Sequence, residues 1–223
     1  MLGIFGGTFD PIHFGHLRVG LDAVEALGLA RLHFVPLAEP VHRNAAAAGA
    51  AHRLAMIAAA IADEPRFVAD DRELRRGGAS YTIDTLRAFR AELPGETLCL
   101  LLGSDAFNGF LSWREPLGIL DLAHVAVLQR PGYRMPDDAE LGRLVAEHRT
   151  ADPRRLRDGG TGAIAFVPVT QLDISATDIR ARCASGRSAR YLTPDPVLQL
   201  IDQEQIYPRD QTIVEGKPGS FGL

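Results

Sequence analysis

Short apolar runs alternate with longer amphipathic stretches along most of the chain, and this alternation restricts the possible folds strongly. Runs rich in β-branched and aromatic residues predict strands at residues 2–5, 31–36, 97–103, 123–129 and 163–169. Helical periodicity separates or follows them, at residues 17–27, 53–62, 82–93, 141–148, 177–183 and 197–203. Apolar strands that alternate with helices are typical of a parallel α/β sheet. We therefore expect a single doubly wound, Rossmann-like domain with a mainly parallel sheet.

Composition and charge narrow the class of protein. The 223 residues are 46% hydrophobic and 23% charged, which excludes disordered and collagen-like chains. With 24 Lys and Arg against 28 Asp and Glu, the net charge is −4, so long nucleic acids and anionic membranes are not attracted. No run approaches the roughly 20 apolar residues of a membrane-spanning helix. We expect a domain over residues 1–207, a flexible tail at 208–223, and neither nucleic acid nor membrane as a partner.

Cysteine usage and the first residues indicate the compartment. Cys99 and Cys183 form no CxxC pair, and no His/Cys spacing typical of a metal site occurs. Residues 1–7 lack the basic start and the long apolar stretch of a signal peptide. We expect a cytoplasmic protein without a disulfide or a metal site of its own. The sequence leaves the oligomeric state open, a homo-oligomer included.

The segment GGTFDPIHFGH, residues 6–16, follows the first predicted strand and carries the clearest functional signal. Ligands of open parallel sheets bind beyond the carboxyl ends of the strands. Gly6 and Gly7 allow a bound group to approach the backbone, and His13 and His16 share one side of a helix start whose positive end favours anions. A tight turn with structural histidines is the alternative, but the combination within one loop favours phosphate binding. The chain has neither a P-loop lysine here nor a GxGxxG pattern, so P-loop ATPase and hydride-transfer sites are not supported.

A second candidate phosphate site lies in ISATDIR, residues 174–180. Ser175 is a good N-cap residue, and Asp178 three positions later completes a pattern like a capping box. The hydroxyl of Thr177, the free N–H groups of the helix start and the charge of Arg180 would suit an anion. Taken in isolation this string is merely a helix start. Together with the first loop it predicts two helix ends that converge on one polyphosphate.

Six further residues have equally plain structural interpretations. Gly103 and Asp105 follow a predicted strand, where Asp105 could cap the next short helix. Thr82 could cap its own helix, and Trp113 could be a core residue. His42 and Arg43 have the composition of an ordinary exposed loop.

GGTFDPIHFGH resembles the signature loop of the nucleotidyltransferase superfamily with an HxGH motif, and the chain is similar to the bacterial nicotinate-mononucleotide adenylyltransferases within it. Matching segments run from residue 3 to about residue 209: PVHR (40–43), SYT (80–82), LLGSDAF (101–107), SW (112–113), AHVAVLQRPG (123–132) and ISATDIR. The resemblance implies a Rossmann-like fold of the nucleotidyltransferase type. It also implies transfer of the adenylyl group of ATP to nicotinate mononucleotide, which yields deamido-NAD and pyrophosphate in NAD biosynthesis. Mg²⁺ would be carried by ATP.

The resemblance also implies roles for individual residues. Catalytic roles fall on His13, His16 and Arg180, with the histidines near the α- and β-phosphate oxygens and the arginine near the leaving end. ATP binding is implied for Gly6, Gly7, Thr8, Phe9, Gly103, Asp105, Ser175 and Thr177. Acceptor binding is implied for His42, Arg43, Thr82 and Trp113.

The sequence departs from the family's usual pattern around the acceptor. Leu37, Val41, Ala79 and Arg114 stand where the family more often has a polar residue, proline, proline and an aromatic residue. Acceptor choice is therefore less determined than adenylyl transfer. Nicotinamide mononucleotide or phosphopantetheine as acceptor, or a non-catalytic nucleotide-binding regulator, are the alternatives.

Overall fold

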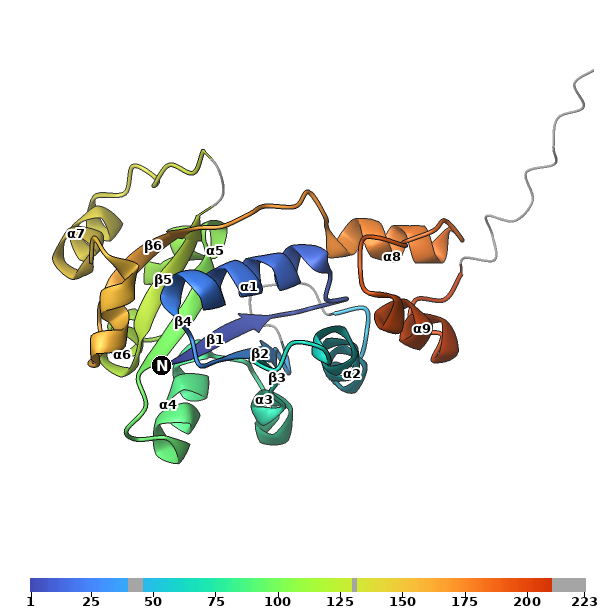
Figure 1. The fold of residues 1–223 in the computed structure, drawn as a ribbon, viewed down its shortest axis with the longest axis horizontal. Coiled ribbons are helices and arrows are strands. Elements are labelled where there is room, and N and C mark those ends of the chain that lie inside the picture. Colours follow the sequence, from blue (N-terminus) through green and yellow to red (C-terminus); the bar gives the residue numbers. More distant parts are fainter. Residues whose placement is uncertain (40–45, 130–131, 210–223) are drawn as a thin grey trace, which may run out of the picture.

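Parallel strands form the centre of the structure (Figure 1). The computed structural model describes residues 1–39, 46–129 and 132–209. Within these ranges the six strands are β1 (Leu2–Gly7), β2 (Arg31–Pro36), β3 (Phe67–Ala69), β4 (Leu98–Gly103), β5 (His124–Gln129) and β6 (Ile164–Pro168). Their order is β3-β2-β1-β4-β5-β6, and each neighbouring pair is parallel. The order reverses between β1 and β4, which confirms the predicted doubly wound sheet.

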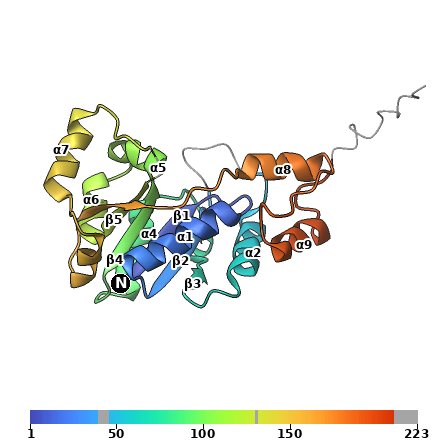
Figure 2. The same ribbon diagram turned by 45° about the horizontal axis from the view of Figure 1, so that its top comes forward.

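Helices cover both faces of the sheet. They are α1 (Phe14–Leu27), α2 (Ala50–Ile61), α3 (Arg72–Arg76), α4 (Thr82–Glu92), α5 (Ser104–Asn108), α6 (Pro116–Leu122), α7 (Ala139–His148), α8 (Ala176–Ala184) and α9 (Asp195–Gln203). Figure 1 shows α1 on one face and α3 and α4 on the other. Figure 2 shows α8 and α9 side by side at the end of the molecule opposite α6 and α7. Among the described residues, none of the helices has the length and apolar character that crossing a bilayer requires.

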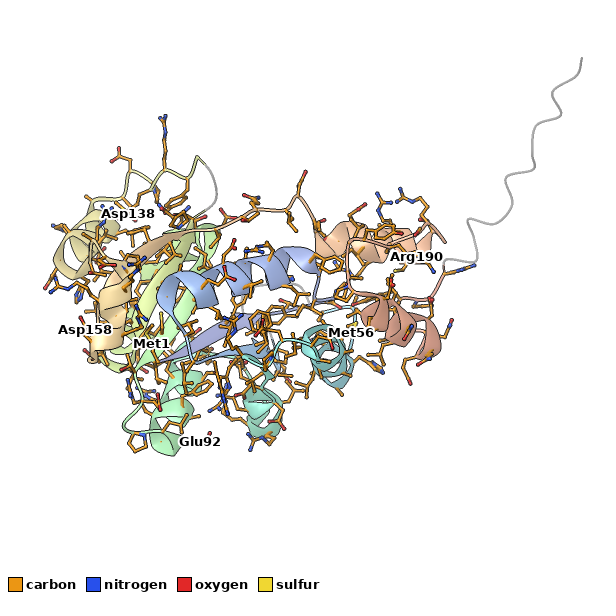
Figure 3. The ribbon with its side chains drawn as sticks, in the orientation of Figure 1. Met1, Met56, Glu92, Asp138, Asp158 and Arg190 are labelled. Atoms are coloured by element: carbon orange, nitrogen blue, oxygen red, sulfur yellow. The ribbon has the colours of Figure 1, made fainter. Side chains whose placement is uncertain are left out.

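The core divides into two clusters because successive strand residues point to opposite faces. Phe34 and Leu101 pack toward α1, α2 and α9, where Met56 lies in the same cluster (Figure 3). Ile4 and Leu100 pack toward α4, α6 and α7. Each such fully buried side chain contributes about 1.5–3 kcal/mol, so both clusters hold the strand ends in fixed positions.

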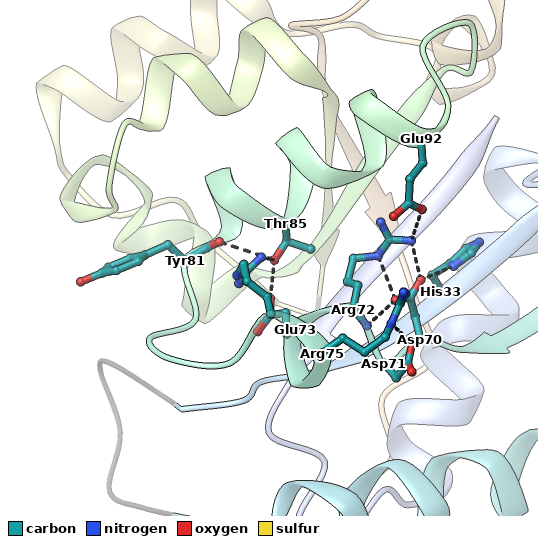
Figure 4. Close-up of polar contacts among 10 residues, drawn as sticks. His33, Asp70, Asp71, Arg72, Glu73, Arg75, Tyr81, Thr85 and Glu92 are labelled. Atoms are coloured by element: carbon teal, nitrogen blue, oxygen red, sulfur yellow. Dashed lines mark hydrogen bonds and ion pairs between the residues drawn. The ribbon is translucent and has the colours of Figure 1, made fainter.

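A buried polar network fastens β3, α3 and α4 at the edge of the sheet (Figure 4). Asp70 accepts from Arg72 Nε and pairs with His33 Nδ1, both at 2.8 Å. Burial alone would raise the pKa of Asp70, but these hydrogen bonds hold it well below its usual range. The Arg72 guanidinium lies 3.3 Å from the centroid of the Phe89 ring, and Thr85 of α4 donates to the Glu73 carboxylate. His33, for which the sequence suggested no role, is therefore a structural residue.

Every predicted strand and helix is confirmed, with ends that differ by at most three residues. The sequence did not indicate β3, α3 or α6, which are short and lack a clear apolar period. Residues 152–162 are polar and mostly exposed, and within them a 3₁₀ turn (Pro153–Asp158) buries Leu156 with the α1 cluster. The low-complexity stretch at 44–51 ends in the first two residues of α2, and residues 44 and 45 lie outside the described ranges.

Two capping predictions are wrong. Gly103 occupies the N-cap position of α5, and Asp105 lies inside the first turn. Tyr81 occupies the N-cap position of α4, so Thr82 is the first helical residue and does not cap it. Ser175 does cap α8, because its hydroxyl accepts from the N–H of Asp178 at 3.1 Å. The tail predicted from residue 208 lies, from residue 210 onward, outside the described residues.

Candidate active site

A cleft opens where the carboxyl ends of β1 and β4 meet, at the reversal of the strand order. It contains two adjoining cavities of about 450 and 700 Å³. Both are bordered by the strand ends and the residues after them, at Gly6, Gly7, Thr8, Gly103 and Asp105. We call the larger one, lined by His13 and His16, the histidine cavity, and the smaller one, lined by Trp113, the tryptophan cavity. Open parallel sheets bind ligands at this place, so the cleft is the candidate site.

His13 and His16 lie at the start of α1 with their rings stacked. The ring centroids are 3.8 Å apart, and the planes are inclined by 27°. The backbone N–H of His13 donates to Nδ1 of His16 at 3.3 Å, and the Phe9 ring meets the His16 ring edge-on, with centroids 5.1 Å apart. The first turn of the helix therefore fixes both imidazoles in the wall of the histidine cavity, beside the positive end of α1.

Burial sets the protonation of His13. The residue is 7% exposed, and loss of water around the charged ring lowers its pKa to about 4. At neutral pH His13 is therefore uncharged and can donate one N–H. A Cβ added at Gly15 would lie 3.0 Å from Cε1 and Nδ1 of His13, so the ring rests on bare backbone. This close approach is the physical reason for glycine between the two histidines.

The start of α8 forms the opposite wall of the histidine cavity, which Ser175, Thr177 and Arg180 line. Arg180 Nη1 donates to the backbone carbonyl of Asp10 at 2.6 Å, and Nη2 donates to Thr177 Oγ1 at 3.3 Å. These bonds hold the guanidinium against the loop that carries His13 and His16, in the wall of the same cavity. Two helix starts, two imidazoles and one arginine therefore border a single space, an arrangement that suits a polyphosphate.

Asp10 joins the histidine loop to two distant segments, a role that the sequence did not show. Its carboxylate accepts from the N–H groups of Ala47 and Ala48 at 2.7 and 3.1 Å. It also accepts from the Tyr207 hydroxyl at 2.6 Å. Burial raises the pKa of that hydroxyl, and the negative charge of the Asp10 carboxylate raises it further. The loop of residues 6–16 is thus held by two backbone N–H groups 37 and 38 positions after Asp10 and by a side chain 197 positions after it.

The tryptophan cavity has an aromatic and partly polar lining. Trp113 is half-buried against Phe110, with ring centroids 5.9 Å apart. Thr82 lines the cavity from the first turn of α4, where the backbone N–H groups of a helix start are available to an anion. The guanidinium of Arg114 lies over the Tyr81 ring at 4.8 Å from its centroid. A flat ring with donors beside it suits an aromatic ligand that carries an acidic group.

Arg53 is a second residue that the sequence did not single out. It is 1% exposed and lies on α2 between the two cavities' supporting loops, where it donates to the carbonyls of Thr8, Leu37 and Ala48. The sequence places Arg53 on the same helical face as Met56 and Ile57. A charged residue in an apolar stripe is uncommon unless it is paired, so this position could have indicated a buried, hydrogen-bonded arginine.

The cleft brings most of the predicted site residues together. The histidine cavity is lined by Gly6, Gly7, Thr8, Phe9, His13, His16, Gly103, Asp105, Ser175, Thr177 and Arg180, and the tryptophan cavity by Thr82 and Trp113. Phe9 is 2% exposed, and its ring packs against Phe5 and Phe34 beneath the cavity. His42 and Arg43 lie outside the described residues. Within the described ranges no group of three His, Cys, Asp or Glu side chains is arranged to hold a metal ion.

Comparison with known proteins identifies the class to which this fold and cleft belong. The family model for cytidylyltransferase-like proteins matches residues 4–182. The fold is similar to solved structures of Plasmodium falciparum nicotinic acid mononucleotide adenylyltransferase, one complexed with NaAD (TM-score 0.68, 18% identity) and one with APC (TM-score 0.65, 16% identity). Each covers 94% of this chain and 98% of its own. At this identity the likeness concerns the fold.

Sequence relatives are much more similar. A probable nicotinate-nucleotide adenylyltransferase of Marinobacter nauticus is 49% identical over 205 residues, which cover 92% of this chain and 95% of that protein. A protein of the same name from Methylococcus capsulatus is 46% identical over 208 residues, 93% of this chain and 99% of its own. The chain therefore belongs to the cytidylyltransferase-like nucleotidyltransferases and, among them, to the nicotinate-nucleotide adenylyltransferase family.

Proposed function

We propose that the protein transfers the adenylyl group of ATP to nicotinate mononucleotide and so forms deamido-NAD and pyrophosphate. The observation that carries this proposal is the pair of cavities that adjoin at the ends of β1 and β4. One has the donors for a polyphosphate, and the other has an aromatic ring for a nicotinate. The names of the relatives and the NaAD complex of the structural neighbour support the same pair of substrates.

The reaction requires alignment of two anions rather than a protein nucleophile. A phosphate oxygen of nicotinate mononucleotide attacks the α-phosphorus of ATP, a new P–O bond forms, and the bond to the β-phosphate oxygen breaks to release pyrophosphate. In our proposal His16 and His13 donate to the α- and β-phosphate oxygens, and Arg180 holds the β- and γ-phosphates. Donors aimed at the charge that develops in the transition state supply the catalysis. Mg²⁺ carried by ATP would neutralise part of the phosphate charge, which the donors of His13, His16 and Arg180 complement.

ATP would occupy the histidine cavity, where Gly6, Gly7 and Gly103 border the phosphates closely. Thr8, Asp105, Ser175, Thr177 and the backbone of Phe9 complete the proposed ATP site. A Cβ at Gly6 or Gly103 would meet no other atom within 4 Å, so these positions face open space in the cleft.

The acceptor would occupy the tryptophan cavity, with the pyridine ring on Trp113 and its carboxylate at the first turn of α4 beside Thr82. His42 and Arg43 are proposed to contact the acceptor phosphate from the segment outside the described residues. A cytoplasmic location, expected from the sequence, is part of the same proposal.

Pyrophosphate release with MgATP tests the proposal, with nicotinate mononucleotide, nicotinamide mononucleotide and phosphopantetheine as parallel acceptors. We expect turnover with nicotinate mononucleotide to exceed that with the other two. Faster turnover with either of the other two would show that the protein is an adenylyltransferase for that acceptor instead. Binding of ATP without release for any acceptor would favour a nucleotide-binding regulator.

His16→Ala tests the catalytic assignment, with the exposed His52→Ala as matched control. We expect kcat to fall about 10²–10³-fold for His16→Ala, the usual effect of losing one transition-state donor. His52→Ala is expected to retain wild-type kcat. Turnover of His16→Ala within a few fold of the wild type would contradict the role of His16.

A further inference from the structure

We propose that Arg53 is a positioning residue that holds the two substrate sites at the separation that adenylyl transfer requires. The inference rests on the proposed function and concerns a residue that touches neither substrate. It stands on hydrogen bonds that join the supporting loops of both cavities through a single buried guanidinium.

The side chain of Arg53 binds three chain segments at once. Nη1 donates to the carbonyl of Thr8 at 2.9 Å, Nη2 to that of Leu37 at 2.6 Å, and Nε to that of Ala48 at 3.2 Å. Thr8 follows β1, Leu37 follows β2, and Ala48 precedes α2. A planar guanidinium with donors in a fixed fork therefore sets the relative positions of these three carbonyls.

One branch of this arrangement leads to the tryptophan cavity. Leu37 lines that cavity, and the N–H of the next residue, Ala38, donates to Ser80 Oγ at 2.8 Å. Ser80 stands immediately before Tyr81 and the start of α4, which border the proposed acceptor site. A shift of the Leu37 carbonyl would therefore move the acceptor side of the cleft.

The other branch leads to the histidine cavity. Ala48, whose carbonyl accepts from Arg53, donates its N–H to Asp10 Oδ1 at 3.1 Å. The backbone carbonyl of Asp10 accepts from Arg180, the residue proposed to hold the leaving phosphates. Thr8 belongs to the wall that both cavities share.

The charge of Arg53 has counterparts on both sides. Burial lowers the pKa of Arg53, and the carboxylates of Asp10 and Glu73 oppose this effect. Glu73 in turn accepts from Thr85 in α4, as Figure 4 shows. The positive charge of Arg53 is thus favoured by the carboxylate of Asp10 and by that of Glu73, which is hydrogen-bonded to α4.

Placement of this kind affects the rate more than the affinity. Each substrate can still bind its own cavity if the two move apart slightly, but the attacking oxygen then misses the α-phosphorus. A misplacement of about 1 Å between reacting groups costs roughly 100-fold in rate.

Arg53→Lys tests the inference, because lysine keeps the charge but carries its three N–H donors on one nitrogen, which cannot occupy the separate positions of Nε, Nη1 and Nη2 that bind the three carbonyls. Trp113 is the one tryptophan of the sequence, so its fluorescence reports acceptor binding, and calorimetry reports ATP binding. We expect both Kd values to stay within threefold of the wild type while kcat falls about 100-fold. Arg72→Lys is the matched control: it alters a buried arginine that lines neither cavity, and it should lower Tm but keep kcat per folded molecule.

Two results would overturn the inference: a kcat within threefold of the wild type in folded Arg53→Lys, or losses of both affinities as large as the loss of kcat. If Arg53→Lys does not fold, Ser80→Ala decides, since it removes the hydrogen bond between Ala38 and Ser80. We then expect kcat to fall while the Kd of nicotinate mononucleotide stays within threefold of the wild type. An unchanged kcat would refute the positioning role of Arg53.

Measurements on the wild type and Arg53→Lys also separate the role of Arg53 from the proposed function. If the wild-type protein shows no adenylyl transfer, the proposed function fails on its own. The positioning role of Arg53 is then tested by measuring the Kd of nicotinate mononucleotide with and without a non-hydrolysable ATP analogue. A change in the wild type that is lost in Arg53→Lys supports that role, and equal behaviour of the two proteins overturns it.

Discussion

The low pKa of buried His13 makes the stability of the protein depend on acid in a predictable way. The pKa falls from 6.5 in an unfolded chain to about 4 in the folded protein, because burial disfavours the charged ring. Below pH 6.5 the unfolded chain binds a proton that the folded protein does not, so stability is lost as the pH falls. The loss begins near pH 6.5 and is complete near pH 4. At pH 5, one and a half pH units below 6.5 at about 1.4 kcal/mol per unit, it amounts to about 2 kcal/mol.

Urea denaturation at pH 7.5 and pH 5.0 measures this loss in the wild type and in His13→Asn, which has no ring to protonate. We expect the free energy of unfolding to fall by about 2 kcal/mol less in His13→Asn than in the wild type between the two pH values. Exposed His52→Asn is the matched control and should behave as the wild type does. An equal loss in wild type and His13→Asn would refute the assignment of the low pKa to His13.

Bound phosphate would reverse part of the burial effect. An anion beside the His13 ring favours the charged imidazole and raises its pKa. Binding of ATP below pH 6 is therefore expected to take up a proton, which calorimetry in two buffers of different ionisation enthalpy detects. Absence of this uptake in the wild type, or the same uptake in His13→Asn, would place the phosphates away from His13.

Three further substitutions test particular contacts. Gly15→Ala crowds the ring of His13 and should lower kcat about tenfold. The Tm should be kept, because alanine stabilises a helix relative to glycine by up to about 1 kcal/mol. A wild-type kcat would contradict the close contact between residue 15 and the His13 ring. Tyr207→Phe removes the hydrogen bond to the Asp10 carboxylate and should lower the free energy of unfolding in urea by about 2 kcal/mol, and an unchanged value would argue against that bond. Asp70→Asn removes the buried carboxylate that pairs with the Arg72 guanidinium and leaves only the more exposed Glu92 at 3.4 Å, so it should cost about 3 kcal/mol in the same assay with kcat per folded molecule unaltered. Loss of kcat instead would show that this network reaches the active site.

Local patterns in the sequence were sufficient to predict the architecture and the main residues of the histidine cavity. The periods of the strands and helices, the cap at Ser175 and the spacing of His13 and His16 each depend on residues within one or two turns of one another. Because loops after parallel strands open at one edge of the sheet, these signals also located the cleft. β3 was missed because three residues are too few to show a period.

Contacts between distant segments and the partners of the buried charges follow from the folded arrangement alone. Asp10 meets Tyr207 across 197 positions, and Arg53 meets the carbonyl of Thr8 across 45. Backbone carbonyls are present at every residue, so no sequence pattern marks the ones that a buried arginine will bind. The neutral state of His13 likewise follows from its surroundings in the folded protein and not from the residue itself. Local sequence thus specifies which groups stand at the strand and helix ends, whereas packing sets the distances between these groups and the protonation of the buried ones.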